Sequence, residues 1–126
     1  MTTYSYQYVV LRCVPRVDRE EFVNVGVVLY CEEAKFLAAE CSVDADRIAA
    51  LAPSVDIAQV TDALAFVEAV CSGDARAGAA ASHPLGQRFG FLKAPKSTTL
   101  QPGPVHGGVT SDPSAELRRL VARLVH

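Results

Sequence analysis

Residues 21–30 read EFVNVGVVLY, the longest run of strand-forming residues in the chain. Such a run predicts a strand in the middle of the fold, with side chains that alternate between two faces. One face is wholly apolar and the other is mixed: Val23, Val25, Val27, Leu29 and Cys31 against Phe22, Asn24, Gly26, Val28 and Tyr30. A strand of this hydrophobicity needs neither an amide nor a missing side chain. Asn24 and Gly26 are therefore the first residues to consider for function.

A strand is predicted on either side of this run, because residues 4–14 are rich in Tyr and Val and residues 35–43 alternate apolar positions. Joining the apolar faces of the first two strands as an antiparallel pair predicts these neighbours: Cys13 with Val23, Leu11 with Val25, Val9 with Val27, Arg12 with Asn24 and Val10 with Gly26. The third strand completes a meander.

Three helices are predicted from their caps and apolar stripes. Asp44 begins a short helix, and Asp56 begins a longer one that ends near Gly73. Asp112, followed by Pro113, begins the C-terminal helix. We therefore expect an α+β fold, in which an antiparallel meander of three or four strands is packed on one face by the two longer helices.

The length of 126 residues predicts a single domain over residues 1–126. Residues 74–82 are rich in Ala and Gly and predict a flexible crossing over the surface. Residues 93–108 hold three prolines and three glycines, so we expect a structured loop with one short strand near residues 97–101. Long structured loops are functional more often than other loops.

The four cysteines, Cys13, Cys31, Cys41 and Cys71, occupy apolar positions and lack the spacing of a zinc site. Free buried cysteines indicate a reducing compartment. The sequence shows neither a signal peptide nor an apolar run long enough to span a membrane. We therefore expect a cytoplasmic protein with no metal, no cofactor and no membrane partner.

The net charge of −2 hides an asymmetry between the two parts of the chain. Residues 1–75 hold five Lys/Arg and twelve Asp/Glu, a net of −7, whereas residues 76–126 hold seven and two, a net of +5. Such a division is typical of two surfaces for different partners, or of two halves that pack against each other. No basic motif interleaved with aromatic residues accompanies it, so nothing favours a nucleic-acid partner.

Arg12, Arg16 and Glu21 cluster at one end of the predicted hairpin, where ion pairs usually contribute little. Glu21 is the only candidate general base there, and it has no paired acid or metal partner. The sequence supplies no complete catalytic set, and we assign no catalytic residue. Asn24 and Gly26 allow two interpretations: a hydrogen-bonded network that fixes the neighbouring loop, or the floor of a ligand or peptide pocket.

Several segments along the chain carry a resemblance: YSYQYVVLRCVP from Tyr4, REEFVNVGVVLY from Arg19, STTLQPGPVHGG from Ser97 and the final helix capped by Asp-Pro. Together they resemble the bacterial domain-of-unknown-function 3037 family (DUF3037). The central acidic, amide and glycine positions of that family are matched by Glu21, Asn24 and Gly26, and its Thr/Gln segment by Thr98, Thr99 and Gln101. The resemblance implies no established activity. It implies a small cytoplasmic companion of proteins resembling HipA-type kinases.

Two functional hypotheses follow. The first is a non-enzymatic binding or accessory module for a protein partner, of which a HipA-like kinase-type protein is the candidate. The alternative is a small enzyme, or a nucleotide- or anion-binding domain, with a pocket over Asn24 and Gly26. The candidate ligand- or partner-binding residues are Arg12, Arg16, Glu21, Asn24, Gly26, Thr99, Gln101 and His106. The sequence leaves the oligomeric state open.

Overall fold

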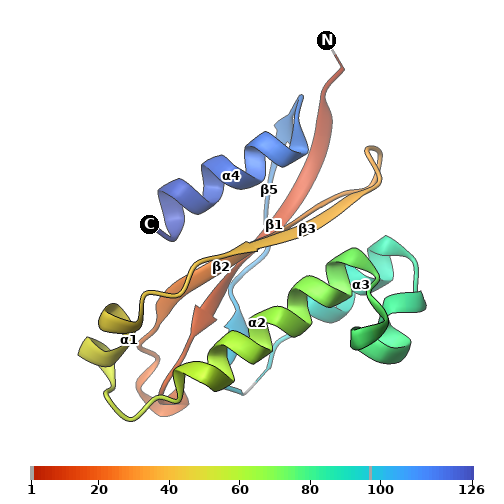
Figure 1. Cartoon of the computed structure of the whole chain (residues 1–126). Helices are drawn as coiled ribbons and strands as arrows, with labels where there is room; N and C mark the ends of the chain where they lie inside the picture. Colours follow the sequence, from red (N-terminus) through yellow and green to blue (C-terminus); the bar gives the residue numbers. More distant parts are fainter. Residues whose placement is uncertain (1, 97) are drawn as a thin grey trace.

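The computed structural model describes residues 2–96 and 98–126, and within them five antiparallel strands form one open sheet (Figure 1). The strands are β1 (Tyr4–Cys13), β2 (Val23–Cys31), β3 (Phe36–Cys41), β4 (Leu100–Pro102) and β5 (His106–Thr110). Their order is β3-β2-β1-β4, and β5 pairs with β1 on the same side as β4 but farther along the strand. The predicted α+β class and meander are confirmed, and the sheet has more strands than we expected.

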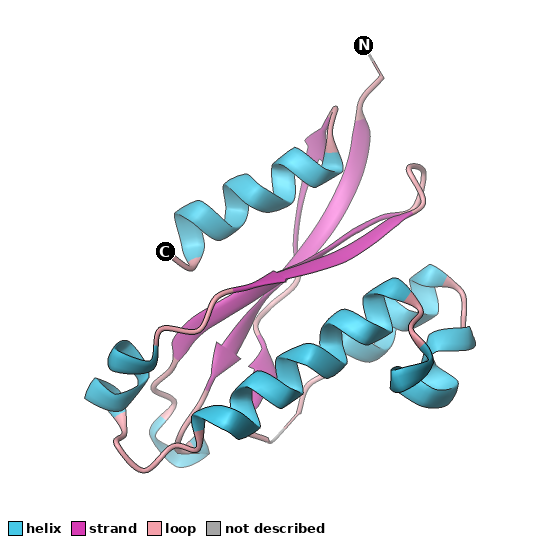
Figure 2. Cartoon of the chain, viewed as in Figure 1, coloured by secondary structure: helices cyan, strands magenta, loops and turns pink. Residues whose placement is uncertain are grey.

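Helical segments connect and cover the strands (Figure 2). They are the 3-10 segments η1 (Val17–Arg19) and η2 (Ala75–Ser82) and the α-helices α1 (Ala45–Leu51), α2 (Ile57–Ser72), α3 (Leu85–Lys93) and α4 (Pro113–Leu124). The predicted caps are present: the carboxylates of Asp44, Asp56 and Asp112 each accept a hydrogen bond from a backbone N–H of the first turn. Gly73, with φ of 75°, ends α2 in the left-handed conformation that favours glycine.

The pairing of β1 with β2 follows the predicted register only at one end. Cys13 pairs with Val23 and Arg12 with Asn24, as expected, but Leu11 pairs with Gly26 instead of Val25. One residue of β2 is therefore left over, which is a β-bulge. The predicted pairs Val9 with Val27 and Val10 with Gly26 are wrong, because each partner moves by one residue to Val28 and Val27.

The bulge reverses which side chains of β2 share a face. Before it, Val23 and Val25 contribute to the same buried cluster as Leu11; after it, Val28 takes that place and Val27 and Leu29 turn to the opposite face. The predicted uniform apolar face from Val23 to Cys31 is therefore wrong. So is the expectation that Asn24 and Gly26 lie on one face. The strand is instead apolar on both sides, as expected for a strand buried between two layers.

Two hydrophobic clusters result, one on each face of the sheet. The helices α2 and α3 cover the first face, whereas α4 packs Leu117, Leu120 and Val121 against Val27 and Leu29 on the second. Figure 1 shows α4 on one side of the sheet and α2 and α3 on the other. The expectation that the C-terminal helix shares a face with α2 is thus wrong, because the bulge gives β2 a second apolar face that needs its own cover.

The helix α3 was not predicted. Gly86 and Gly90 weaken its helical signal, yet it buries Phe89, whose ring stacks on Tyr30 at a centroid distance of 5.2 Å. Gly86 allows a close approach there, because a Cβ would lie 3.0 Å from the Tyr30 hydroxyl. Residues 74–82, expected as a flexible crossing, contain η2, with Asp74 as its N-cap. The strand expected near residues 97–101 corresponds to β4; Ser97 lies outside the described residues.

Candidate functional site

The hairpin end of the sheet brings three of the predicted residues into one row. Arg12 on β1 pairs with Asn24 on β2 and with Gln101 on β4, so the three lie side by side across three strands. We call these three residues the Arg12 row. The other five candidate residues lie outside this row. Gly26 is buried on the α2 face, and His106 pairs with Tyr8 in the middle of β1.

The Arg12 guanidinium packs against Phe22 and Gly103, and its Nε has no hydrogen-bond partner among the described residues. Its guanidinium carbon lies 4.0 Å from the centroid of the Phe22 ring, a cation–π contact. Gly103 packs against its other side, where a Cβ would come within 3.1 Å of the guanidinium carbon. The buried Nε donates to no group among the described residues. The side-chain oxygen of Gln101, the neighbour of Arg12 on β4, does not accept from it, and the Nε2 of Gln101 donates to the carbonyl of Thr98.

Asn24 links the sheet to the end of the final helix. Its Nδ2 donates to the carbonyl of Leu124 at 3.0 Å, and Arg47 donates to the carbonyls of Val125 and His126. The last carbonyls of a helix have no N–H partner within the helix, and here the side chains of Asn24 and Arg47 supply the donors. The amide of Asn24 thus bonds to α4, and among the described residues it makes no hydrogen bond to the neighbouring loop. The Oδ1 atom of Asn24 is buried without a described partner.

Gly26 has a steric role on the opposite face. A Cβ at this position would lie 2.9 Å from Cys41 Sγ and 3.1 Å from the carbonyl oxygen of Glu40 on β3. Glycine therefore permits β3 to approach β2 at this point. Because Gly26 is buried beneath Cys41 and Asn24 faces α4, the predicted pocket over both residues is not formed.

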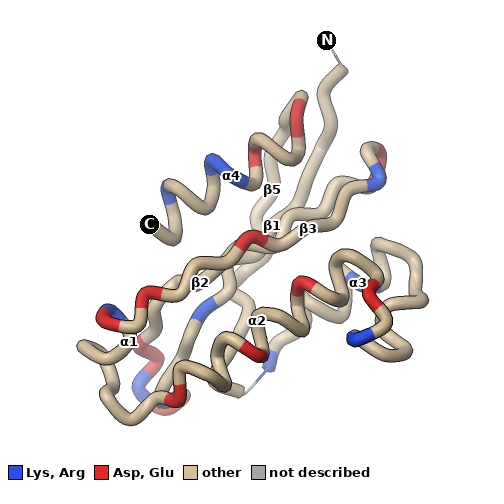
Figure 3. The backbone as a smooth tube through the Cα atoms, viewed as in Figure 1, with Lys and Arg blue, Asp and Glu red and all other residues tan. Residues whose placement is uncertain are grey.

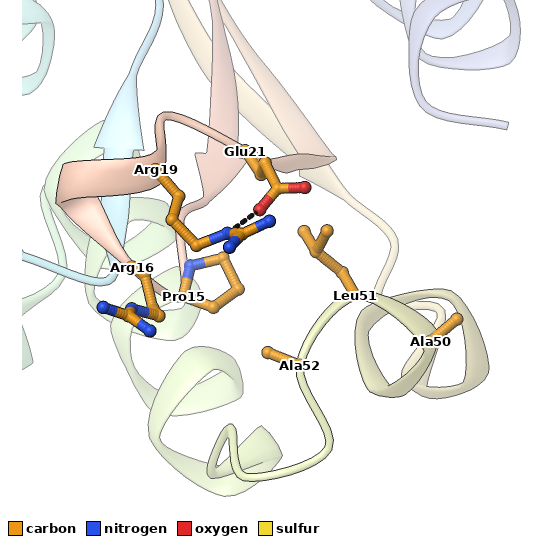
Figure 4. Close-up of a pocket in the computed structure, with 7 residues that line it drawn as sticks. All are labelled: Pro15, Arg16, Arg19, Glu21, Ala50, Leu51 and Ala52. Carbon is orange, nitrogen blue, oxygen red and sulfur yellow. Dashed lines mark hydrogen bonds and ion pairs between the residues drawn. The ribbon is translucent and has the colours of Figure 1, made fainter.

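Arg16 and Glu21 line a surface cavity of about 340 Å³ between the β1–β2 connection and α1 (Figure 4). Arg19 and Glu21 point toward each other there and form an ion pair, while Arg16 pairs with Asp18. The hydrogen bond from Arg19 holds the pKa of Glu21 below its ordinary value. A carboxylate with a lowered pKa is a weaker proton acceptor, so Glu21 is poorly suited to the general-base role that we had considered.

Thr99 and His106 make separate contacts. The carbonyl of Thr99 accepts a hydrogen bond from the backbone N–H of Val14 at 2.6 Å, which ties the loop before β4 to the end of β1. The ring of His106 stacks on Tyr8 at a centroid distance of 5.3 Å. Both contacts fasten the C-terminal half of the chain to β1. Among the described residues, the side chains of Thr99 and His106 make no hydrogen bond to Arg12, Asn24 or Gln101.

An apolar site lies between α2, α3 and β4, and we call it the Phe66–Phe91 cleft. Its volume is about 230 Å³, and its lining is Leu11, Ala63, Phe66, Val67, Phe91, Leu92, Lys96, Thr98, Leu100, Gln101 and Pro102. Phe66 and Phe91 meet edge to face at a centroid distance of 6.3 Å. They remain 42% and 45% exposed, which is unusual for aromatic side chains of a small domain.

Lys96 supplies the charged group of this cleft. Its ammonium donates to the carbonyls of Phe91 and Ala94 at 2.9 and 3.1 Å and lies 5.1 Å from the centroid of the Phe91 ring. It therefore caps the end of α3, where a positive charge is favourable. Burial lowers the pKa of Lys96. An ammonium has three N–H donors, so one remains for a further acceptor.

Residues 8–125 match the model of a family described as a protein of unknown function, DUF3037. The chain belongs to the DUF3037 family. The match includes the Arg12 row and the whole of the Phe66–Phe91 cleft within one family domain. Comparison with the curated proteins and with the solved structures gave no match.

The charge asymmetry of this DUF3037 domain does not create a single basic surface. Among the cationic residues of its C-terminal part, Arg88 and Lys93 lie on α3 and Arg118, Arg119 and Arg123 on α4, and these two helices cover opposite faces of the sheet (Figure 3). Arg76 lies in η2, and Lys96 follows α3. Within residues 2–96 and 98–126, no group of three or more His, Cys, Asp or Glu side chains is arranged to hold a metal ion. None of the helices in these ranges has the length and apolar character needed to cross a membrane.

The cleft was missed from the sequence because its two aromatic residues come from different helices. Phe66 lies on the predicted helix α2, but Phe91 lies on α3, which the glycines conceal. The available signal was the RFGFL segment, in which two aromatic residues alternate around Gly90 in an otherwise small-residue region. On a helix, Phe89 and Phe91 point in different directions, so one is buried and the other remains exposed.

Proposed function

We propose that this chain is a non-enzymatic, cytoplasmic accessory module that binds a protein partner through the Phe66–Phe91 cleft. The observation that carries the proposal is the exposed aromatic pair beside an apolar cleft. Contiguous exposed apolar surface marks binding sites, whereas single exposed apolar residues are common on any protein. Binding hot spots are enriched in such aromatic clusters, with polar groups around them. Lys96, Thr98 and Gln101 supply the polar groups here.

The chemistry of the cleft restricts the partner. An apolar side chain of the partner enters the cleft beside Phe66 and Phe91, and a neighbouring carboxylate accepts a hydrogen bond from the free N–H of Lys96. The partner class that we propose is a protein resembling HipA-type kinases, which is the association that the family resemblance implies. No catalytic role is required of Glu21 or of any other residue.

The test is a binding titration between the purified chain and a HipA-like protein encoded in the same genome. We expect Phe66→Ala and Phe91→Ala each to weaken the complex by roughly tenfold or more, the loss typical of a binding hot spot. Val109→Ala, which removes a 64% exposed side chain from β5, is the control and should leave the affinity unchanged. Absence of a complex would reject the proposed partner class. An affinity insensitive to both phenylalanines would reject the cleft.

A second candidate function rests on two buried atoms, Arg12 Nε and Asn24 Oδ1, that have no hydrogen-bond partner among residues 2–96 and 98–126. One is a donor and the other an acceptor, on residues that pair between β1 and β2, and Asn24, Phe22 and Arg47 line a cavity of about 490 Å³. A small anionic ligand with a hydroxyl or N–H, such as a nucleotide, has complementary groups. Thermal-shift titration with nucleotides and inorganic phosphate tests this: stabilisation that is lost in a folded Asn24→Ala variant supports it, and no stabilisation rejects it.

A further inference from the structure

The strand β3 forms an outer edge of the sheet. It pairs with β2 on one side, and no strand among the described residues pairs with its other side. In Figure 1 it is the strand nearest the viewer, with α4 and α2 on either side of it. Exposed edges are usually protected by Lys, Pro or a bulge, yet β3 reads FLAAEC, with Glu40 as its only charge.

The pairing pattern identifies which backbone groups of β3 are free. Bonded and non-bonded pairs alternate along an antiparallel ladder. The N–H of Ser42 donates to the carbonyl of Val25, so Glu40, Ala38 and Phe36 are the residues that bond to β2. The N–H and C=O groups of Leu37, Ala39 and Cys41 therefore point to the outer edge.

A groove of about 380 Å³ runs along this edge between β3 and α2. Much of its lining is small: Ala38, Ala39, Ala65, Ala69 and Ser72. Ala38 and Ala39 remain partly exposed in the middle of the strand, and small side chains allow another backbone to approach closely. The charged residues of the groove are Glu68 and Arg76.

We propose that the β3 edge pairs antiparallel with the β3 edge of a second copy of this chain, about a two-fold axis at Ala39. In this register Ala39 faces its own copy and Leu37 faces Cys41 of the second copy. These are the three residues whose N–H and C=O groups point outward, so every one of them gains a partner. The two sheets then continue into one, and the arrangement closes as a dimer.

The charges of the groove favour a second copy over an unrelated strand. Glu68 lies beside Cys41, whose pKa is raised to about 12 by burial and also by this carboxylate. Glu68 lies one turn before the C-terminal end of α2, and Arg76 lies beyond that end, in η2. There Arg88 ties α2 to α3, and Phe89 of α3 stacks on Tyr30, the cross-strand neighbour of Leu37, which lines the groove together with Arg76. A two-fold axis at Ala39 reverses this order, so Glu68 of each copy faces Arg76 of the other. Arg76 is 78% exposed and only locally paired with Asp74, so it can reach across.

Sedimentation velocity and light scattering over a range of protein concentrations test this inference, which is independent of the proposed function. We expect a dimer for the natural chain and at least tenfold weaker association for Glu68→Arg and for Arg76→Glu. The double variant Glu68→Arg/Arg76→Glu restores the dimer, because it exchanges the two charges. Asp62→Arg, on α2 but outside the groove lining, is the matched control and stays dimeric.

A backbone variant tests the strand pairing itself. Ala39→Pro removes an outward N–H at an edge position that tolerates proline, so the variant should keep its circular dichroism spectrum and become monomeric. If this variant does not fold, hydrogen exchange of the natural chain gives the same information: the amides of Leu37, Ala39 and Cys41 should be more protected at dimer-forming concentrations. A natural chain that is monomeric throughout, or a charge-exchanged double variant that stays dissociated, overturns the inference.

Discussion

Arg12 and Asn24 stand opposite each other on β1 and β2, immediately before the pairing register of the two strands shifts by one residue. The shift leaves Asn24 facing α4, where its amide donates to the carbonyl of Leu124. It also turns Gly26 to the other face, beneath Cys41. The two residues that first indicated function therefore connect the sheet to different layers of the fold.

Asn24→Ala should lower the free energy of unfolding by about 1–3 kcal/mol, because it removes the donor to Leu124 and leaves a partly buried carbonyl unpaired. Asn24→Asp should lower it further, since a carboxylate oxygen would then face that carbonyl. Urea titration measures both. Ser5→Ala, at an exposed position of β1, is the control and should stay within about 0.5 kcal/mol of the natural chain. A natural-like midpoint for Asn24→Ala would show that α4 is held without this bond.

Two glycines should respond to alanine with opposite signs. Gly26→Ala places a Cβ 2.9 Å from Cys41 Sγ and 3.1 Å from a backbone oxygen of β3, so we expect a loss of about 1–3 kcal/mol. Gly90 lies inside α3 with nothing within 4 Å of an added Cβ, so Gly90→Ala should raise the stability by about 0.5–1 kcal/mol. Thermal unfolding of the two variants side by side measures the difference.

A double-mutant cycle locates the clash at Gly26. Cys41→Ala removes the nearer of the two obstacles but leaves the carbonyl of Glu40 in place. The cost of Gly26→Ala should therefore be smaller in the Cys41→Ala background, without disappearing. Equal costs in both backgrounds would mean that the β3 backbone, and not the thiol, determines the strain.

The local signals of the sequence were sufficient for the elements that depend on near neighbours. Asp112 and Pro113 predicted the start of α4, and Asp56 with Gly73 predicted both ends of α2, because a helix cap is formed by residues a few positions apart. The pairing of Arg12 with Asn24 was also predicted, because the connection between β1 and β2 determines the register nearest to it.

The bulge at Val25 had no local signal, since an unbroken alternation from Val23 to Cys31 was equally compatible with the sequence. Three successive apolar residues, Val27, Val28 and Leu29, are expected only in a strand that is covered on both faces. Whether the second face of β2 is covered depends on where α4 packs. The cleft was unpredictable for a similar reason. Phe66 and Phe91 come together through the packing of α2 against α3, which no spacing in the sequence reveals.

Cys41 and Cys71 should resist thiol reagents in the folded protein. Burial raises the pKa of each to about 12, and the thiolate is the reactive form, so at pH 8 alkylation should be far slower in the native chain than in urea. Iodoacetamide labelling followed by peptide mass spectrometry measures each rate. Rapid native labelling of Cys71 would contradict its burial.

The same pKa values give a sign for the pH dependence of stability. The folded thiols hold their protons more tightly than unfolded thiols, whose pKa is near 9.0. Their contribution is therefore complete below about pH 9 and is lost as the pH rises toward 12. Urea unfolding at a series of pH values should show a steeper alkaline decline for the natural chain than for Cys41→Ala.

Arg88→Ala should lower the free energy of unfolding more than Arg118→Ala does. The Nη1 of Arg88 donates to the carbonyls of Val70 and Cys71 at 2.9 and 3.0 Å, and its Nε donates to the carbonyl of His83 at 2.9 Å. It thus joins the end of α2 to the start of α3, and hydrogen bonds to a charged group contribute about 1.5–3 kcal/mol.

Arg88→Lys separates the geometry of this contact from its charge. A single ammonium cannot reproduce the planar fork that reaches three carbonyls, so we expect it to recover only part of the lost stability. Arg118→Ala is the matched control, because that side chain bonds only to Ser114 on the solvent face of α4 and its loss should cost within about 0.5 kcal/mol. Full recovery by Arg88→Lys in urea titration would mean that the positive charge at the end of α2 is sufficient, and that the fork is not needed to hold α3 in place.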